Sequence, residues 1–172
     1  LSGDLGKSIL DHIITVNADL VLESDESLAP TGVIRSVTGT PMDFRKPTPF
    51  GARINENYDL LKYGIGYDSC YVLNKKEVGE LSFAASAYEP VSGRYLEVWS
   101  TEPGMQLYSG NFLEGKVPRD LGKGNTLYFF RSAFSFEPHH FPNSPNKPHF
   151  PSTVLKVGET YSGKIIAKFS TK

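Results

Sequence analysis

The carboxylate of Glu137 stands where a general base could be held. An alternating apolar pattern typical of a β-strand leads up to it, and a turn dense in proline and asparagine follows over residues 138–148. A strand would hold the carboxylate rigidly while the loop leaves it accessible, which is what proton abstraction requires. A surface turn that merely follows a glutamate explains the same pattern, so the residue types alone leave both interpretations open.

Two further polar residues could bind a ligand. Asp68 opens a strand-like run over 68–73, and Gln106 lies in a turn–strand–turn pattern over 101–113. An amide both donates and accepts hydrogen bonds and carries no charge to be desolvated, so Gln106 suits a ligand rich in hydroxyl groups. A turn residue at the start of a strand is the structural alternative for Asp68, and a purely structural strand is the alternative for Gln106.

Composition argues against several classes of partner. The formal net charge of the 172 residues is −1 and the basic residues are scattered, which disfavours nucleic acid and anionic membranes. No apolar stretch approaches the ~20 residues of a membrane span. The single cysteine, Cys70, excludes an internal disulfide and fits a reducing compartment, so we expect a cytoplasmic protein with an inert, buried thiol.

The histidines of the proline-rich segment do not form a metal-binding pattern. His139, His140 and His149 lie close together in the sequence, with no cysteine nearby. Zinc sites usually combine paired cysteine and histidine spacings with further ligands. We therefore expect solvated loop histidines and no metal site.

The elements that would position these residues are mostly strands. Glycines and prolines separate short apolar segments at intervals typical of an all-β protein. The patterns predict a hairpin of strands 81–88 and 94–100 around a turn at 89–93, and a helical turn at 57–62. Further strands are predicted at 11–21, 32–37, 71–73, 105–109 and 163–170. The expected fold is an antiparallel β-sandwich in a single domain.

Three separated blocks of the sequence resemble the aldose 1-epimerases, the galactose mutarotases. The segment that contains Glu137 reads F-x-x-E-x-x-x-F-P-x-S-P-N-K-P-x-F-P-S and is followed by V-G-E-T-Y. The segment of Gln106 reads T-E-P-G-x-Q-x-Y-x-G-N-F-L, and that of Asp68 is similar to the family pattern G-x-D-H-x-[FY]. Ser69 replaces the usual histidine of the last pattern, and His139 stands where the family often has glutamine.

The resemblance implies a fold, an activity and roles for these residues. It implies a galactose mutarotase-like supersandwich, of which residues 1–172 form the C-terminal part of a single, incomplete domain. Glu137 would be the catalytic base and Asp68 and Gln106 would bind the hydroxyls of an aldohexose, with no cofactor. The acid histidine of the family would fall before residue 1, so we expect the chain alone to be nearly inactive and poorly stable.

Other functions remain open at this stage. A glycoside hydrolase could use Asp68 and Glu137 as its carboxylate pair, although the single tryptophan gives little evidence of aromatic subsites. A non-catalytic half-domain could bind a monosaccharide through Asp68 and Gln106. A purely structural β-domain is the third alternative.

Overall fold

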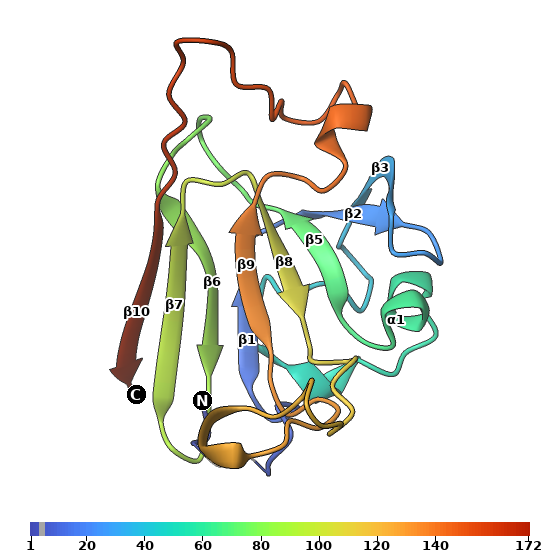
Figure 1. The fold of residues 1–172 in the computed structure, drawn as a ribbon, viewed down its shortest axis with the longest axis vertical. Helices are drawn as coiled ribbons and strands as arrows, with labels where there is room; N and C mark the ends of the chain where they lie inside the picture. Colours follow the sequence, from blue (N-terminus) through green and yellow to red (C-terminus); the bar gives the residue numbers. More distant parts are fainter. Residues whose placement is uncertain (4–5) are drawn as a thin grey trace.

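The protein consists of two five-stranded antiparallel sheets packed face to face (Figure 1). The computed structural model describes residues 1–3 and 6–172. The first sheet has the order β10-β7-β6-β1-β4, and the second has the order β3-β2-β5-β8-β9. This arrangement confirms the predicted antiparallel β-sandwich.

The elements are short, as expected for a sandwich. The strands are β1 Ile13–Val16, β2 Leu20–Ser24, β3 Pro30–Ser36, β4 Thr48–Pro49, β5 Asp68–Val72, β6 Ser82–Tyr88, β7 Arg94–Ser100, β8 Gly104–Tyr108, β9 Ser135–His139 and β10 Ile165–Thr171. One short helix, α1 Asp59–Gly64, and three 3-10 turns, Phe50–Ala52, Lys123–Asn125 and Ser144–Asn146, complete the described elements. Within the described part of the chain, no helix combines the length and apolarity needed to cross a membrane.

The predicted hairpin is present as β6 and β7. Tyr88 lies opposite Tyr95, next to the turn, and the pairing continues to Ser82 and Ser100 with one register shift. The turn closes because Gly93 adopts a φ of 70°, a conformation that side-chain-bearing residues rarely take. The local pattern of alternating residues around a glycine turn was therefore sufficient to predict this element.

The single strand predicted over 11–21 is wrong. The chain forms β1 in the first sheet and β2 in the second, and residues 17–19 cross from one layer to the other. At the crossing, the Asn17 side-chain amide donates to the Phe83 carbonyl at 2.9 Å, which ties the crossing to β6. Asn17 is a polar residue in the middle of an apolar run. Its side chain bonds to β6, and β1 ends at the residue before it, Val16.

The main core fills the space between the sheets. Aromatic rings from loops close its centre, where Phe44 packs edge-on against Tyr67 with centroids 4.9 Å apart. The hydroxyls of Tyr67 and Tyr71 donate to the carbonyls of Pro41 and Met42, at 3.1 and 2.9 Å. Both phenols are thus fully buried without an unpaired hydroxyl.

A second, smaller core lies on the outer face of the second sheet. The loop after β9 folds back over the strands there, and Phe141 and Phe150 pack with Leu22 and Cys70. The Cys70 side chain is buried, as predicted, and burial raises the pKa of its thiol to about 12. A thiol in this environment is inert at neutral pH.

Candidate functional site

The structure brings Asp68, Gln106 and Glu137 together on the outer face of the second sheet. In the sheet register, Gln106 of β8 lies opposite Cys70 of β5 on one side and opposite Glu137 of β9 on the other. Asp68 is two residues from Cys70, so its side chain projects from the same face of the sheet. Residues that are 69 positions apart in the sequence (68 to 137) therefore form one row across three adjacent strands.

Hydrogen bonds fix the orientation of both carboxylates in this row. The Gln106 amide nitrogen Nε2 donates to Oδ1 of Asp68 at 2.6 Å. The Ser135 hydroxyl donates to Oε1 of Glu137 at 2.6 Å, from a position on the same strand and face. Both bonds are short and involve a carboxylate, so they hold the side chains in defined positions.

The two carboxylates differ in their surroundings. Asp68 is half-buried, and burial raises the pKa of its carboxyl above the ordinary value, against the opposing effect of the Gln106 hydrogen bond. The negative charge of Glu137 acts in the same direction as burial and raises the pKa of Asp68 further. Glu137 is exposed to solvent. One carboxylate is thus shielded and one is open to an incoming ligand.

An aromatic wall stands at the Asp68 end of the row. Tyr108 lies opposite Asp68 in the register, and its ring is stacked parallel to that of Phe112, with centroids 6.3 Å apart. The Tyr108 hydroxyl accepts a hydrogen bond from the Phe112 amide at 2.9 Å, which anchors the turn after β8. An apolar ring beside a row of hydrogen-bonding groups is a common arrangement for binding the apolar face of a sugar.

A small hollow beside Asp68 and Gln106 contains an acidic residue that the sequence analysis missed. Glu23 of β2 lines this hollow together with Leu28 and other residues of the β2–β3 turn. Its carboxylate accepts hydrogen bonds from Thr31 Oγ1 at 2.9 Å and from Arg35 Nε at 2.6 Å. No motif marks Glu23 in the sequence, because only the pairing of β2 with β5 brings it near the site.

Glu137 occupies a different place in its strand from the one predicted. It was expected at the end of a strand where the turn begins, but it is the third residue of β9, which continues through Pro138 to His139. A proline inside a strand usually argues against strand structure, because it has no N–H to donate. Here β9 is an edge strand of the second sheet, where proline is tolerated.

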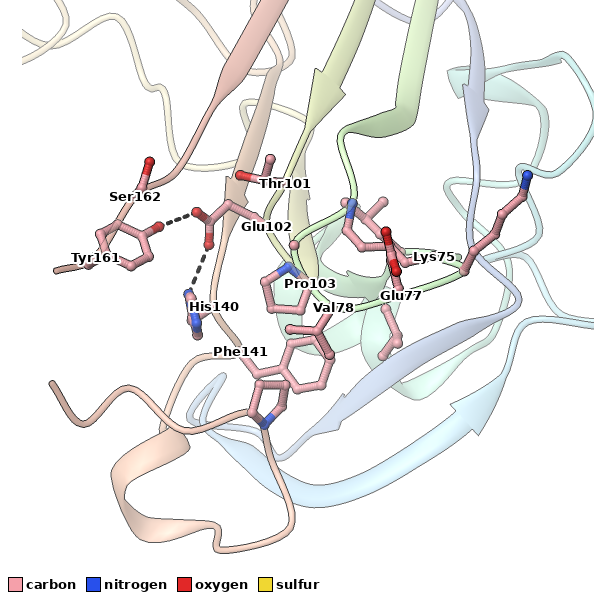
Figure 2. A pocket seen from close by; sticks show the side chains of 15 residues that line it. Lys75, Glu77, Val78, Thr101, Glu102, Pro103, His140, Phe141, Tyr161 and Ser162 are labelled. Carbon is pink, nitrogen blue, oxygen red and sulfur yellow. Dashed lines mark hydrogen bonds and ion pairs between the residues drawn. The ribbon is translucent and has the colours of Figure 1, made fainter. Parts of the chain in front are cut away.

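The prediction that the histidines are solvated loop residues is wrong for two of the three. His139 lies in β9, and the Nδ1 atom of His140 lies 2.8 Å from Oε2 of the buried Glu102. The other carboxylate oxygen of Glu102 accepts a hydrogen bond from the hydroxyl of Tyr161, and both contacts are drawn in Figure 2. Among the residues that the structure describes, no group of three or more histidine, cysteine, aspartate or glutamate side chains could hold a metal ion.

The carboxylate of Glu102 connects three parts of the chain beside a cavity of about 520 Å³ (Figure 2). It precedes β8, while His140 follows β9 and Tyr161 precedes β10. Asp68, Gln106 and Glu137 do not line this cavity. The contacts of Glu102 therefore support the strand ends near the row rather than the row itself.

Replacing Glu102 with alanine is expected to destabilise the fold. The change removes the charged acceptor of the half-buried His140 and the exposed Tyr161 from a buried position, a loss of about 1–3 kcal/mol in the free energy of unfolding. Thermal melting monitored by circular dichroism should show a lower Tm. The exposed Glu26→Ala provides the control, and equal melting of both variants would contradict the role given to Glu102.

The Ser69→Ala variant should have the opposite effect. Ser69 alternates with Asp68 and Cys70, so it points into the main core, where its hydroxyl is buried without a hydrogen-bond partner. Removing an unsatisfied buried hydroxyl relieves a desolvation penalty and leaves almost the same volume. We expect an increase in Tm of about 1–4 °C; a decrease would mean that the hydroxyl has a partner in solution.

The fold and the site together define a class of protein. This is an antiparallel β-sandwich whose outer sheet face presents an amide between two carboxylates, beside an aromatic wall. The sequence model of the aldose 1-epimerase family matches residues 1–168, and the chain belongs to that family. The resemblance of its three sequence blocks to this family is thereby confirmed.

Relatives and solved structures agree with this assignment. The chain is 39% identical over 170 residues to galactose mutarotase of Rattus norvegicus, covering 99% of this chain and 47% of that protein. It is 33% identical over 156 residues to aldose 1-epimerase of Escherichia coli (strain K12), covering 90% of this chain and 43% of that protein. A crystal structure of an aldose epimerase homologue from C. elegans superposes with a TM-score of 0.82 at 29% identity, covering 99% of this chain and 48% of that one. The chain therefore spans about half the length of the relatives that it matches.

Proposed function

We propose that this chain contributes the catalytic base and sugar-binding groups of an aldose 1-epimerase, which interconverts the α and β anomers of a hexose such as galactose or glucose. The observation that carries the proposal is the row on the second sheet, in which Gln106 lies between Asp68 and Glu137. Membership of the family supports the reaction type.

The proposed reaction opens and recloses the sugar ring. Glu137 takes the proton of the anomeric hydroxyl, and the bond between C1 and the ring oxygen breaks with its electron pair on that oxygen. An acid then protonates the ring oxygen, which gives the open-chain aldehyde. Rotation about the bond next to C1 and the reverse steps produce the other anomer. Proton transfer and positioning account for the catalysis, and neither step consumes a redox cofactor.

Each residue of the row has a distinct part in this reaction. Glu137 is solvent-exposed and oriented by Ser135, so it can reach the anomeric hydroxyl. Asp68 and Gln106 bind sugar hydroxyls, with the amide able to donate one hydrogen bond and accept another. The family resemblance assigns the acid to a histidine that does not match any of the four histidines of this chain. We propose that this acid belongs to the part of the family domain that comes before the part matched by this chain.

We also propose a cytoplasmic location for the protein. The one cysteine is free and buried, which agrees with a reducing compartment.

The relatives' names mention galactose and aldoses, and a small soluble sugar of this kind is the substrate that we propose.

The pair of carboxylates on one sheet face keeps glycoside hydrolysis as a second candidate. Asp68, with its raised pKa, would act as the acid and Glu137 as the base or nucleophile. Hydrolysis differs from mutarotation in that a glycosidic bond is lost, so the two activities are measured separately.

The deciding experiment uses a chimera in which residues 1–168 replace the matching part of rat galactose mutarotase. Polarimetry of freshly dissolved α-galactose should show accelerated mutarotation, and nitrophenyl galactosides should stay intact. Galactose binding without acceleration would instead indicate a non-catalytic sugar-binding protein. Release of nitrophenol would indicate a glycoside hydrolase.

A further inference from the structure

A hollow that is separate from the row is lined almost entirely by charged side chains. It lies between the loop that joins β3 to β4 and the turn that follows β4, and its volume is about 610 Å³. Its lining residues are Asp43, Arg45, Lys46, Thr48 and Arg53. None of them belongs to the row or to the cavity beside Glu102. With three cations and one carboxylate, this basic hollow carries a net positive charge.

The one carboxylate of the basic hollow is already neutralised. Arg45 donates from Nε to Oδ1 of Asp43 at 2.9 Å and from Nη2 to Oδ2 at 2.7 Å, which is the forked geometry of a strong ion pair. These bonds hold the pKa of the Asp43 carboxyl below its ordinary value. The Nη1 atom of Arg45 contacts a second carboxylate, that of Asp19, at 3.1 Å. Arg45 thus has two acidic partners, and even with Asp19 counted the cations outnumber the carboxylates.

Arg53 has no acidic partner among the residues that the structure describes. Its Nη2 atom donates to the backbone carbonyl of Asp43, and its guanidinium lies over the ring of the buried Phe44, 5.7 Å from the centroid. Its Nε atom is buried without a hydrogen-bond partner. These contacts fix the guanidinium, but a carbonyl and a ring do not neutralise its charge. A charge that is partly removed from water and has no counter-ion favours the binding of an anion.

Lys46 adds a second unpaired positive charge at the rim. Its side chain is exposed and makes none of the ion pairs found in the described part of the chain. The Thr48 hydroxyl donates to the Lys46 carbonyl at 2.8 Å, so it is not the donor that a ligand would meet. The hydrogen bonds to an anion would therefore come mainly from Lys46 and Arg53.

We propose that the basic hollow binds a phosphate group, carried either by inorganic phosphate or by a phosphorylated sugar. The planar N–H groups of a guanidinium match two phosphate oxygens, and a lysine ammonium adds a further charge and donors. A dianion interacts with both unpaired cations, whereas a neutral sugar gains nothing from their charge. A single phosphate group fits better than a polyanion, because the basic residues of the chain are scattered and its net charge is −1.

A phosphate bound there would also stabilise the short strand β4. This strand has only two residues, and its register with β1 consists of Ile13 opposite Pro49 and Ile14 opposite Thr48. Lys46 precedes β4 and Arg53 follows it, so an anion held by both connects the two ends of this segment. A ligand that binds only the folded state raises the Tm in proportion to its occupancy.

Isothermal titration calorimetry of the chain with sodium phosphate and with galactose 6-phosphate tests the proposal. We expect one site, whose affinity falls as sodium chloride screens the charges. Arg53→Gln should weaken binding about 10-fold or more, because it removes a charged hydrogen-bond donor. Lys46→Gln, at an exposed position, should weaken it about 2–5-fold without affecting the fold. The exposed Lys156→Gln is the matched control and should leave the affinity unchanged.

The two ligands distinguish the two sources of the phosphate group. Tighter binding of galactose 6-phosphate, lost in Arg53→Gln, would identify a phosphorylated sugar as the occupant, and equal or weaker binding would identify inorganic phosphate. The chimera contains every residue of the basic hollow, so the same titrations apply to it.

Three results would overturn the proposal. The first is the absence of phosphate binding to protein with the circular dichroism of a folded β-sandwich. The second is an affinity that Lys46→Gln leaves unchanged, or that Lys156→Gln lowers as much, since the attraction would then not be specific to this hollow. The third is displacement of phosphate by galactose, which would place the phosphate in the row.

Discussion

Glu137→Gln, introduced into the chimera with rat galactose mutarotase, is expected to lower the rate of galactose mutarotation about 10²–10⁴-fold, the usual contribution of a general base. The glutamine keeps the shape of the side chain and can still accept the hydrogen bond from Ser135, which donates to Oε1 at 2.6 Å. What it loses is the ability to take a proton. The effect should therefore appear in kcat, with little change in KM.

Polarimetry at several galactose concentrations separates these two parameters. Glu80→Gln controls for the loss of one negative charge, because this carboxylate is not part of the row and accepts a hydrogen bond from the Lys76 amide. Equal rates for Glu137→Gln and the unmodified chimera would mean that another group is the base. A drop in galactose affinity alone would assign Glu137 to binding.

Asp68→Asn should weaken sugar binding and strengthen the fold at the same time. The asparagine oxygen can still accept the hydrogen bond from Gln106, so the geometry of the row is retained. Loss of a charged hydrogen-bond acceptor for a sugar hydroxyl is expected to raise KM about 10-fold or more. The fold gains because a half-buried charge next to Glu137 is removed.

The pH dependence follows from the direction of the pKa shift. Folding raises the pKa of Asp68 above the ordinary value of 3.8, so the folded state holds this proton more tightly than the unfolded state does. Asp68 therefore contributes stability below pH 3.8, and this contribution is lost as the pH rises through the folded pKa. The higher Tm of Asp68→Asn should be present at neutral pH. The difference in Tm should shrink as the pH falls through the folded pKa of Asp68 toward 3.8.

Thermal melting of both proteins between pH 3 and pH 8 measures this difference, with the exposed Asp11→Asn as the control. A lower Tm for Asp68→Asn at neutral pH would show that the carboxylate is stabilising where it stands. In that case the stabilisation of the ionised carboxylate by the hydrogen bond from Gln106 would be larger than the destabilisation caused by burying its charge.

Local patterns predicted the parts of the fold that depend on neighbouring residues. The β6–β7 hairpin follows from alternation and a glycine turn, and the strand nature of residues 105–109 from the same signal. The break between β1 and β2 was not predictable, because it depends on a contact between Asn17 and Phe83, which are 66 residues apart. Propensity patterns carry no information on contacts at that distance.

The candidate site shows the same division. Sequence blocks marked Asp68, Gln106 and Glu137 individually, but their assembly into one row depends on the pairing of β5, β8 and β9. Residues without a motif were missed altogether, such as Glu23, which is near the site only through β2. Glu102 stands in the quoted block of Gln106, but its contact with His140 was still missed, because the two residues are 38 positions apart and meet only in the folded chain.

The covering of Cys70 has a consequence for how the protein can be followed in solution. Phe141 and Phe150 shield its sulfur from the solvent, and the loop that carries them is the continuation of the strand that holds Glu137. Because Cys70 is buried beneath this loop, we expect a thiol reagent to reach it when the loop opens, so the labelling rate measures how often the loop opens. Labelling that is faster than global unfolding would identify the loop as a separately opening unit. Labelling in the presence of galactose would then report whether an occupied site keeps the loop closed.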